Sequence, residues 1–447
     1  MINRRPFPAI VAACFVAAAC QSARSEDAPA QPLISTASAI SLESPLTLEK
    51  AQEVAWDNHG SILTAREGVT AAGERVRQAR TGTLPSVNAE VSYGVSGSGG
   101  RSGGGFSGGA QSDTGIQPRV SLDYTIYDGG LTRAAVRQAR ANVTGSEASL
   151  QSARNNLAFS VSRSFFDQLR AERLLSLREE QEKLAEEQLK SVDAMIDAGS
   201  AAKADRALQE SELRRVQVDR IQAENDIAIA ANALRNVMGL PAGEPMQLKE
   251  PADTAQKDTK LEELIQTALG QRPEVVQARA RVTSAEASVD VARISRRPRV
   301  DTTLGASYTP ENDSERTGWD AGASVSMPVF DFGLSRSRQK EAEADARSAV
   351  EDLRQAEKDV TADVTEAYNN LLSARARVSA SRLARDAAKV NLDQETERYR
   401  LGATGSSVLS VFTAQVQYAA AGNTLIDAEY DRMTAGAQLE RALGVTK

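Results

Sequence analysis

The 447-residue chain has few of the side chains on which most enzyme chemistry depends. It contains one histidine, His59, and two cysteines, Cys14 and Cys20, and only 4% of its residues are aromatic. A zinc, haem or iron–sulfur site needs several histidine or cysteine ligands, and a hydrolase triad needs a suitably placed histidine. We therefore expect no cofactor, no bound metal and no enzyme activity.

An excess of positive charge and long apolar runs are lacking as well. Lys and Arg total 53 against 60 for Asp and Glu, and the formal net charge of −7 argues against nucleic-acid binding. The glycine-rich stretch between Gly94 and Gly115 lacks the pattern of a phosphate-binding loop. Beyond the N-terminus no run of 18 or more apolar residues occurs, so a role in a membrane would have to use β-strands.

The N-terminus has the layout of a secretory signal peptide. Asn3-Arg4-Arg5 is a basic start, and an apolar core with small residues runs from Pro8 to Ala19. Residues 1–19 are therefore predicted to be a signal peptide, and 20–46 an N-terminal periplasmic segment. Cleavage after Ala19 leaves Cys20 first, the position lipidated in bacterial lipoproteins. Lipidation of Cys20 and simple cleavage both stay open.

The rest of the chain contains one unit twice. The segment Tyr127-Asp128-Gly129-Gly130-Leu131-Thr132-Arg133 is echoed about 200 residues later by Phe330-Asp331-Phe332-Gly333-Leu334-Ser335-Arg336, and the same offset relates Gly199 to Gly402. Residues 47–240 and 260–447 are predicted to be two structural repeats, joined by a linker at 241–259.

Each repeat has the same predicted order of elements. A helix leads into two strands of period-two alternation, which are followed by a long proline-free helix and a return helix. The strands are about ten residues long, the span of a tilted transmembrane strand. The glycines 199 and 402 end the long helices, so we expect two antiparallel hairpins with coiled-coil packing. The expected helices are 47–80, 131–197 and 202–238, then 260–296, 334–400 and 406–443, and the alternating segments are 87–95, 120–126, 300–306 and 321–329.

Four strands per chain cannot close a barrel, and an open sheet edge in lipid leaves backbone groups unpaired at a cost of several kcal/mol each. Two chains give eight strands, whose interior side chains usually fill, whereas three give twelve strands with room for a pore. The predicted fold is a membrane α+β fold. It comprises a trimeric 12-stranded outer-membrane β-barrel, continued by a periplasmic α-helical coiled-coil barrel. Tyr127 and Phe330 are expected in one aromatic girdle, and Tyr93, Tyr308 and Trp319 in the other.

This doubled arrangement resembles the TolC family of outer-membrane efflux and secretion channels, over nearly all of the mature chain. The matching motifs are Leu84-Pro85-Ser86, Tyr127-Asp128-Gly129-Gly130, Phe330-Asp331-Phe332-Gly333 and Glu397-Arg398-Tyr399-Arg400-Leu401-Gly402. The resemblance implies a homotrimer in the outer membrane that extends into the periplasm. It also implies docking on a periplasmic adaptor protein and an inner-membrane pump of RND or ABC type. The cargo is drugs, other small molecules or secreted proteins, and this choice stays open.

The resemblance further implies a gate at the periplasmic end. In the family an aspartate after the first tip glycine engages a tyrosine before the second, and these places are Asp205 and Tyr399. Gly199 and Gly402 are the expected hairpin tips and adaptor contacts.

Other gate positions depart from the family pattern. The acidic or amide ring of the family falls on Ser410 and Thr413, and a basic clasp residue falls on Thr404. A charge-locked or strongly cation-selective gate is therefore not expected.

Two alternatives remain at this point. The chain could be a periplasmic coiled-coil scaffold or adaptor without a pore, whose strands form a small soluble sandwich. Four arginines near a strand start either contact lipid headgroups or lipopolysaccharide, or simply lie at a solvated helix end: Arg293, Arg296, Arg297 and Arg299.

Overall fold

The computed structural model describes residues 45–98, 111–199, 201–251, 260–311, 314–401, 403 and 407–445. The predicted signal peptide, Cys20, Gly402 and Thr404 lie outside the described residues.

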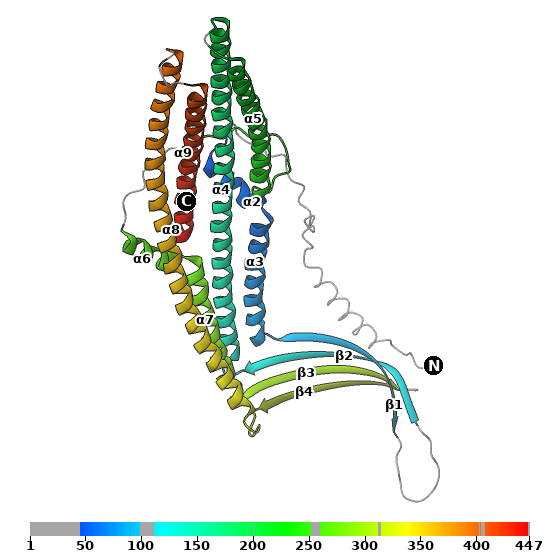
Figure 1. Cartoon of the computed structure of the whole chain (residues 1–447). Helices are drawn as coiled ribbons and strands as arrows, with labels where there is room; N and C mark the ends of the chain where they lie inside the picture. The colour runs from blue at the N-terminus through cyan, green and yellow to red at the C-terminus, as the bar shows by residue number, and fades with distance from the viewer. Residues whose placement is uncertain are drawn as a thin grey trace, which may run out of the picture. The chain divides into compact units, whose positions relative to one another are not determined.

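The same order of elements occurs twice along the described chain (Figure 1). The first repeat consists of α2 (Leu48–Asn58), α3 (Gly60–Arg80), β1 (Ser86–Ser98), β2 (Gln111–Tyr127), α4 (Leu131–Asp197) and α5 (Lys203–Val237). The second consists of α6 (Leu261–Gln271), α7 (Pro273–Ile294), β3 (Arg299–Glu311), β4 (Ser314–Ser326), α8 (Leu334–Arg400) and α9 (Val408–Leu443). The two long helices have the predicted bounds.

The helices pack as neighbouring hairpins. α4 contacts α5 on its return, and it also packs against α3, α7 and α9, while α8 packs against α7 and α9. Figure 1 shows the four strands side by side at the end of the helices opposite the hairpin tips. Alanine is frequent on the buried helix faces, which lets helix backbones approach closely; examples are Ala134, Ala141, Ala148, Ala185, Ala231 and Ala367.

The first helix of each repeat is broken, and the predicted single helix over 260–296 is wrong in this respect. His59 separates α2 from α3, and its Nδ1 accepts the Ser61 N–H at 3.3 Å. Arg272 separates α6 from α7 with extended backbone angles, and Pro273 is the first residue of α7. Proline has no N–H to continue the α6 hydrogen-bond ladder, so the chain turns there.

At each break, the C-terminal end of the return helix of the same repeat packs closely against the backbone. Gly239 follows α5 with φ +74°, and a Cβ placed there would lie 2.9 Å from the carbonyl oxygen of Asn58. Gly444 follows α9 with the same φ, and its Cβ would lie 3.1 Å from the Cα of Arg272. Both positions therefore require glycine for two reasons, the left-handed backbone and the close approach of another chain segment.

The strand-to-helix joints are also duplicated. The Gly130 and Thr132 N–H groups donate to the Asp128 carboxylate at 2.8 and 2.6 Å, and Asp331 accepts from the corresponding groups of the second joint at 3.1 and 2.9 Å. The first N–H groups of a helix have no partner within the helix, so each aspartate caps a long helix. Partial burial acts to raise the pKa of Asp128, but these hydrogen bonds favour the charged form and lower the pKa below its ordinary value.

Replacement of Gly239 by Ala should destabilise the protein by about 3 kcal/mol, because it adds a left-handed alanine and a steric clash. Gly199→Ala is the matched control: it has φ +72°, but no described atom lies within 4 Å of its Cβ position, so we expect a loss of about 1 kcal/mol. Urea unfolding in detergent, followed by circular dichroism, measures both. Equal losses would show that the contact with Asn58 contributes nothing.

Asp128→Ala should cost about 1 kcal/mol at neutral pH, because the first turn of α4 loses its cap. Asp128→Asn keeps an acceptor and should lose less. The lowered pKa in the folded state means that the charged carboxylate adds stability above its unfolded pKa of about 4, and that this stability is lost as the pH falls toward the folded pKa. The urea midpoint of Asp128→Ala should consequently fall less than that of the wild type between neutral pH and about pH 3. A wild-type midpoint for Asp128→Ala at neutral pH would contradict the capping role.

Candidate functional site

The register of the four-stranded sheet collects apolar residues from all strands on one face. The strands are antiparallel in the order β1-β2-β3-β4, so the two repeats meet at the pairing of β2 with β3. One row across the sheet is Val87, Leu122, Leu304 and Ala321, and the next on that face is Ala89, Val120, Ala306 and Trp319. The period-two pattern of the sequence therefore produces a continuous apolar face.

No helix covers this apolar face in the described part of the chain. The exposed fractions are 84% for Trp319 and 71% for Val91, Tyr93 and Val325. An uncovered apolar face of this extent marks an interaction surface, since soluble monomers seldom expose contiguous apolar patches so large.

The opposite face of the sheet carries a polar network. The Asn88 amide donates to the Asp123 carboxylate at 3.1 Å, and the Thr125 hydroxyl donates to Asp301 at 2.8 Å. Arg119 of the first repeat forms a 3.2 Å ion pair with Asp320 of the second. This pair was not predicted. Its members are 201 residues apart in sequence, and only the strand register brings them together.

The sheet has unpaired outer strands, and two of the helices have exposed apolar faces. Among the described residues, β1 pairs only with β2, and β4 pairs only with β3, so one side of each is unpaired. On α8 the exposed residues Leu372, Leu383 and Val390 are spaced by 11 and 7 residues, which returns them to one side of the helix. A similar stripe on α5 consists of Val218, Ile221 and Ile229.

The predicted gate residues Asp205 and Tyr399 lie near the hairpin tips, close enough for the charge of Asp205 to act on the Tyr399 hydroxyl. Partial burial and the negative charge of Asp205 both raise the pKa of Tyr399. The Asp205 carboxylate accepts the Ala202 N–H at 3.1 Å, so it also caps the first turn of α5. Within the described residues no hydrogen bond joins the two side chains directly.

The other predicted gate positions have their hydroxyls engaged locally. The Ser410 hydroxyl donates to the Ser407 carbonyl at 2.8 Å in the N-terminal turn of α9, and Thr413 donates to the Leu409 carbonyl at 2.8 Å. Gly199, the first predicted tip, is exposed and directly follows α4 and Ala198. Gly402, the second, lies outside the described residues.

Three buried glutamines behind the tips were also missed. Gln181, Gln209 and Gln415 come from α4, α5 and α9 and are 8%, 1% and 7% exposed. In the described part of the chain each has at least one side-chain amide atom without a hydrogen-bond partner. Their places among the apolar seam positions of the hairpins are the only signal that could have identified them.

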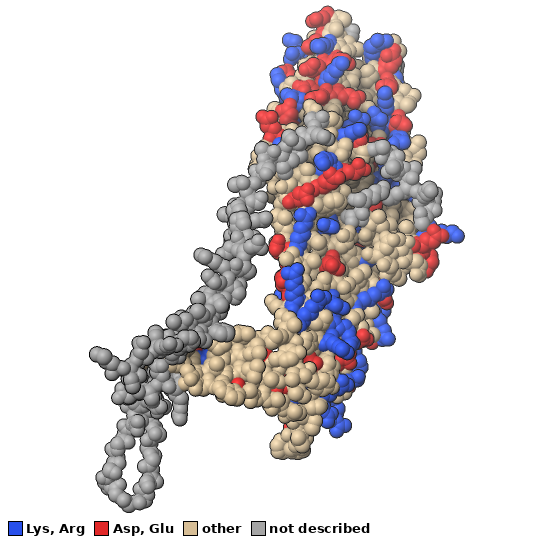
Figure 2. All heavy atoms as spheres, turned by 180° about the vertical axis from the view of Figure 1, so that it is seen from behind, with Lys and Arg blue, Asp and Glu red and all other residues tan. Residues whose placement is uncertain are grey.

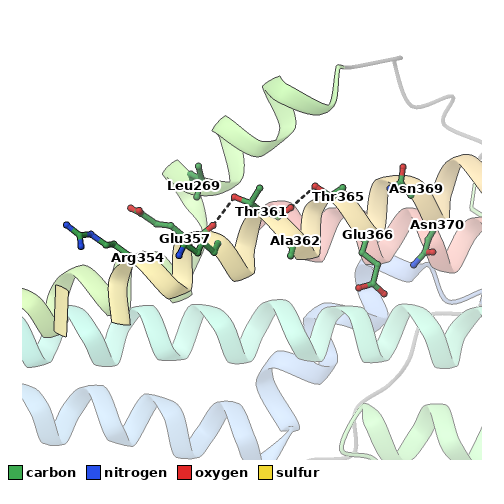
Figure 3. Close-up of a pocket in the computed structure, with 10 residues that line it drawn as sticks. Leu269, Arg354, Glu357, Thr361, Ala362, Thr365, Glu366, Asn369 and Asn370 are labelled. Carbon is green, nitrogen blue, oxygen red and sulfur yellow. Dashed lines mark hydrogen bonds between the residues drawn. The ribbon is translucent and has the colours of Figure 1, made fainter. Parts of the chain in front are cut away.

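An open groove of about 870 Å³ lies between Leu269 of α6 and the outer side of α8 (Figure 3). The Thr361 and Thr365 hydroxyls in it donate to the carbonyls of Glu357 and Thr361 at 2.8 and 2.7 Å. These two hydroxyls serve their own helix, while Lys358, Glu366, Asn369 and Asn370 also line the groove.

The described residues contain no group of three or more His, Cys, Asp or Glu side chains that could hold a metal ion. None of the described helices has an apolar stretch long enough to cross a membrane.

Comparisons with known proteins identify the family. The family model described as outer membrane efflux protein matches residues 53–240 and 264–445. The outer membrane protein TolC of Vibrio cholerae is 24% identical over 427 residues, covering 92% of this chain and 94% of that protein. TolC of Escherichia coli is 23% identical over 389 residues, covering 84% and 77%. The solved structure of the CmeC outer membrane channel of Campylobacter jejuni has a TM-score of 0.76 at 16% identity, covering 89% of this chain and 85% of that one.

The fold likeness confirms the predicted architecture of the single chain, and the family match confirms the resemblance that the sequence motifs indicate. The protein belongs to the outer membrane efflux protein family: it is an export channel of the outer membrane and not an enzyme.

Proposed function

We propose that three copies of the chain form one conduit, in which their sheets close a twelve-stranded barrel and their helices continue it as a tube into the periplasm. The observation that carries this proposal is the combination of an uncovered apolar face with two unpaired edge strands. In a bilayer the apolar face contacts lipid chains instead of water. The β4 strand of one chain can pair with β1 of the next, which leaves no open edge. The polar face then lines the lumen.

The exposed apolar stripes support the same assembly along the helices. α5 packs mainly against α4, and α8 packs against α7 and α9, so each has a side free for a neighbouring copy. Covering both stripes in a closed ring removes apolar surface from water at about 25 cal/mol per Å².

The conduit is the outer-membrane part of an export system that a periplasmic adaptor and an inner-membrane pump complete. The tips, including Gly199, are the proposed adaptor contact. In this proposal the pump selects the cargo, a small molecule or a secreted protein.

Substitutions at two adjacent residues of β1 test which face of the sheet contacts lipid and which faces the lumen. Val91→Arg places a charge on the lipid face and should reduce insertion, with a cost of about 2–4 kcal/mol near the bilayer midplane. Ser92→Arg is the control, because Ser92 faces the polar side and should insert normally. The measurements are the amount of trimer in outer-membrane fractions and the conductance of the purified trimer in planar bilayers. A water-soluble monomer would instead support the scaffold alternative.

We also propose that Asp205 and Tyr399 hold the periplasmic end closed. The Tyr399 hydroxyl is protonated at physiological pH, and the raised pKa keeps it so beside the carboxylate, so it can donate to Asp205 when the tips draw together. Ser410 and Thr413 add no charge to the constriction.

Asp205→Ala and Tyr399→Ala should each raise the conductance of the isolated trimer, because each removes one side of the contact. Lys203→Ala is the control: Lys203 lies in the same exposed turn of α5, and its loss should leave conductance near the wild-type value. Planar-bilayer recording measures all three. Wild-type conductance in both test variants would refute the gate.

A further inference from the structure

Six arginines lie at the junction between the helices and the sheet. Arg80 ends α3, Arg296 and Arg297 follow α7, Arg133 lies in the first turn of α4, and Arg336 and Arg338 lie in the first two turns of α8. All six are exposed. Figure 2 shows Lys and Arg gathered over this end of the helices. These six residues are called the arginine collar below.

The collar differs from the hairpin tips in its pairing. At the tips Arg206 pairs with Asp193 at 2.9 Å and with Glu210 at 2.9 Å, and Arg398 pairs with Glu395 at 2.9 Å. Among the described residues, none of the six collar guanidinium groups lies within ion-pair distance of a carboxylate. The collar arginines thus have no ion-pair partner, although the Arg297 guanidinium donates to the Gly129 carbonyl at 2.9 Å and the charge of Arg296 helps to lower the pKa of Asp331. Their neighbours Arg293 and Arg299 do form ion pairs, with Glu343 and Asp301.

Helix electrostatics do not account for the whole collar. Arg80 at the C-terminus of α3 agrees with the helix dipole, which favours cations there. Arg133 and Arg336 contradict it, because each is the third residue of a long helix, where the dipole favours acidic side chains. The first turns of both helices contain no acidic residue. Both repeats thus place a cation in the first turn of a long helix, where the capping carboxylates of Asp128 and Asp331 offset part of the unfavourable interaction with the dipole.

Exposed apolar side chains border the collar on its sheet side. Val329, Phe330 and Phe332 are 86%, 77% and 92% exposed, and the two rings lie 4.6 Å apart edge to face. Phe332 has φ 52°, the only positive φ among the described residues other than glycine. The corresponding residue of the first repeat is Gly129. A strained backbone therefore holds a large ring in solvent.

We propose that the arginine collar binds the phosphates of anionic phospholipids in the periplasmic leaflet of the outer membrane. The proposal rests on the proposed barrel, which puts the sheet in lipid and the collar at headgroup depth on its periplasmic side. Apolar rings enter the acyl boundary there while guanidinium groups meet phosphates, for which their planar fork is suited.

The test uses the full mature trimer and the double variant Arg133→Gln/Arg336→Gln. In detergent, phosphatidylglycerol and phosphatidylcholine are titrated separately, and bound lipid is counted by native mass spectrometry. The wild type should bind phosphatidylglycerol preferentially. The double variant should bind it about 30-fold more weakly, since each arginine near an anionic lipid contributes about fivefold. Arg398→Gln/Arg400→Gln, at the tips, is the control and should bind as the wild type does.

Equal binding of the two lipids by the wild type would overturn the proposal, and so would unchanged phosphatidylglycerol binding by the double variant. Displacement of the lipid by millimolar inorganic phosphate would also overturn it, because it would indicate a site for free anions. A merely structural role of the two arginines would lower the stability of the double variant, whereas helix electrostatics predict that removing Arg133 and Arg336 leaves the helix starts at least as stable. Trimer formation and conductance in phosphatidylcholine bilayers are measured in parallel, so failure of the collar is distinguished from failure of the barrel.

Discussion

The backbone hydrogen bonds of one four-stranded sheet constrain everything else in this protein. Within the described chain β1 and β4 each have one unpaired side, and the apolar face between them is uncovered. Water can satisfy such an edge, but lipid cannot. A sheet with this face is therefore stable in a bilayer only as part of a closed cylinder, and closure requires further copies of the chain. The proposed closure by three copies and the pore within it rest on that one requirement.

The duplication shows which local features the architecture needs. Asp128 and Asp331 cap the two long helices with equivalent hydrogen bonds, and Gly239 and Gly444 end the return helices against equivalent breaks. The breaks themselves are made differently, by a capping histidine at His59 and by proline after Arg272. The geometry of each joint is thus kept while the residues that produce it differ.

The arginines at the two ends of the helices differ in how they are paired with carboxylates. At the tips, arginines are neutralised by carboxylates of the same chain, so the tips carry no large unbalanced field that would resist rearrangement. At the sheet end the six collar arginines form no ion pair among the described residues, although their neighbours Arg293 and Arg299 do, and the adjoining aromatic rings are exposed. The difference agrees with the two proposals, a protein contact at the tips and a headgroup contact at the sheet end.

The sequence by itself determined the repeated order of elements, the bounds of α4 and α8 and the two-faced strands, because periodicity and capping are local properties that the chain expresses residue by residue. It missed the break at Arg272, although Pro273 signalled it, because the apolar pattern continues across the turn. Only the tertiary structure decided that Arg119 meets Asp320, that the charge of Asp205 reaches Tyr399, and that three glutamines are buried behind the tips. Those facts depend on strand register and helix packing between segments up to about 200 residues apart, and no local pattern specifies which distant residues share a contact.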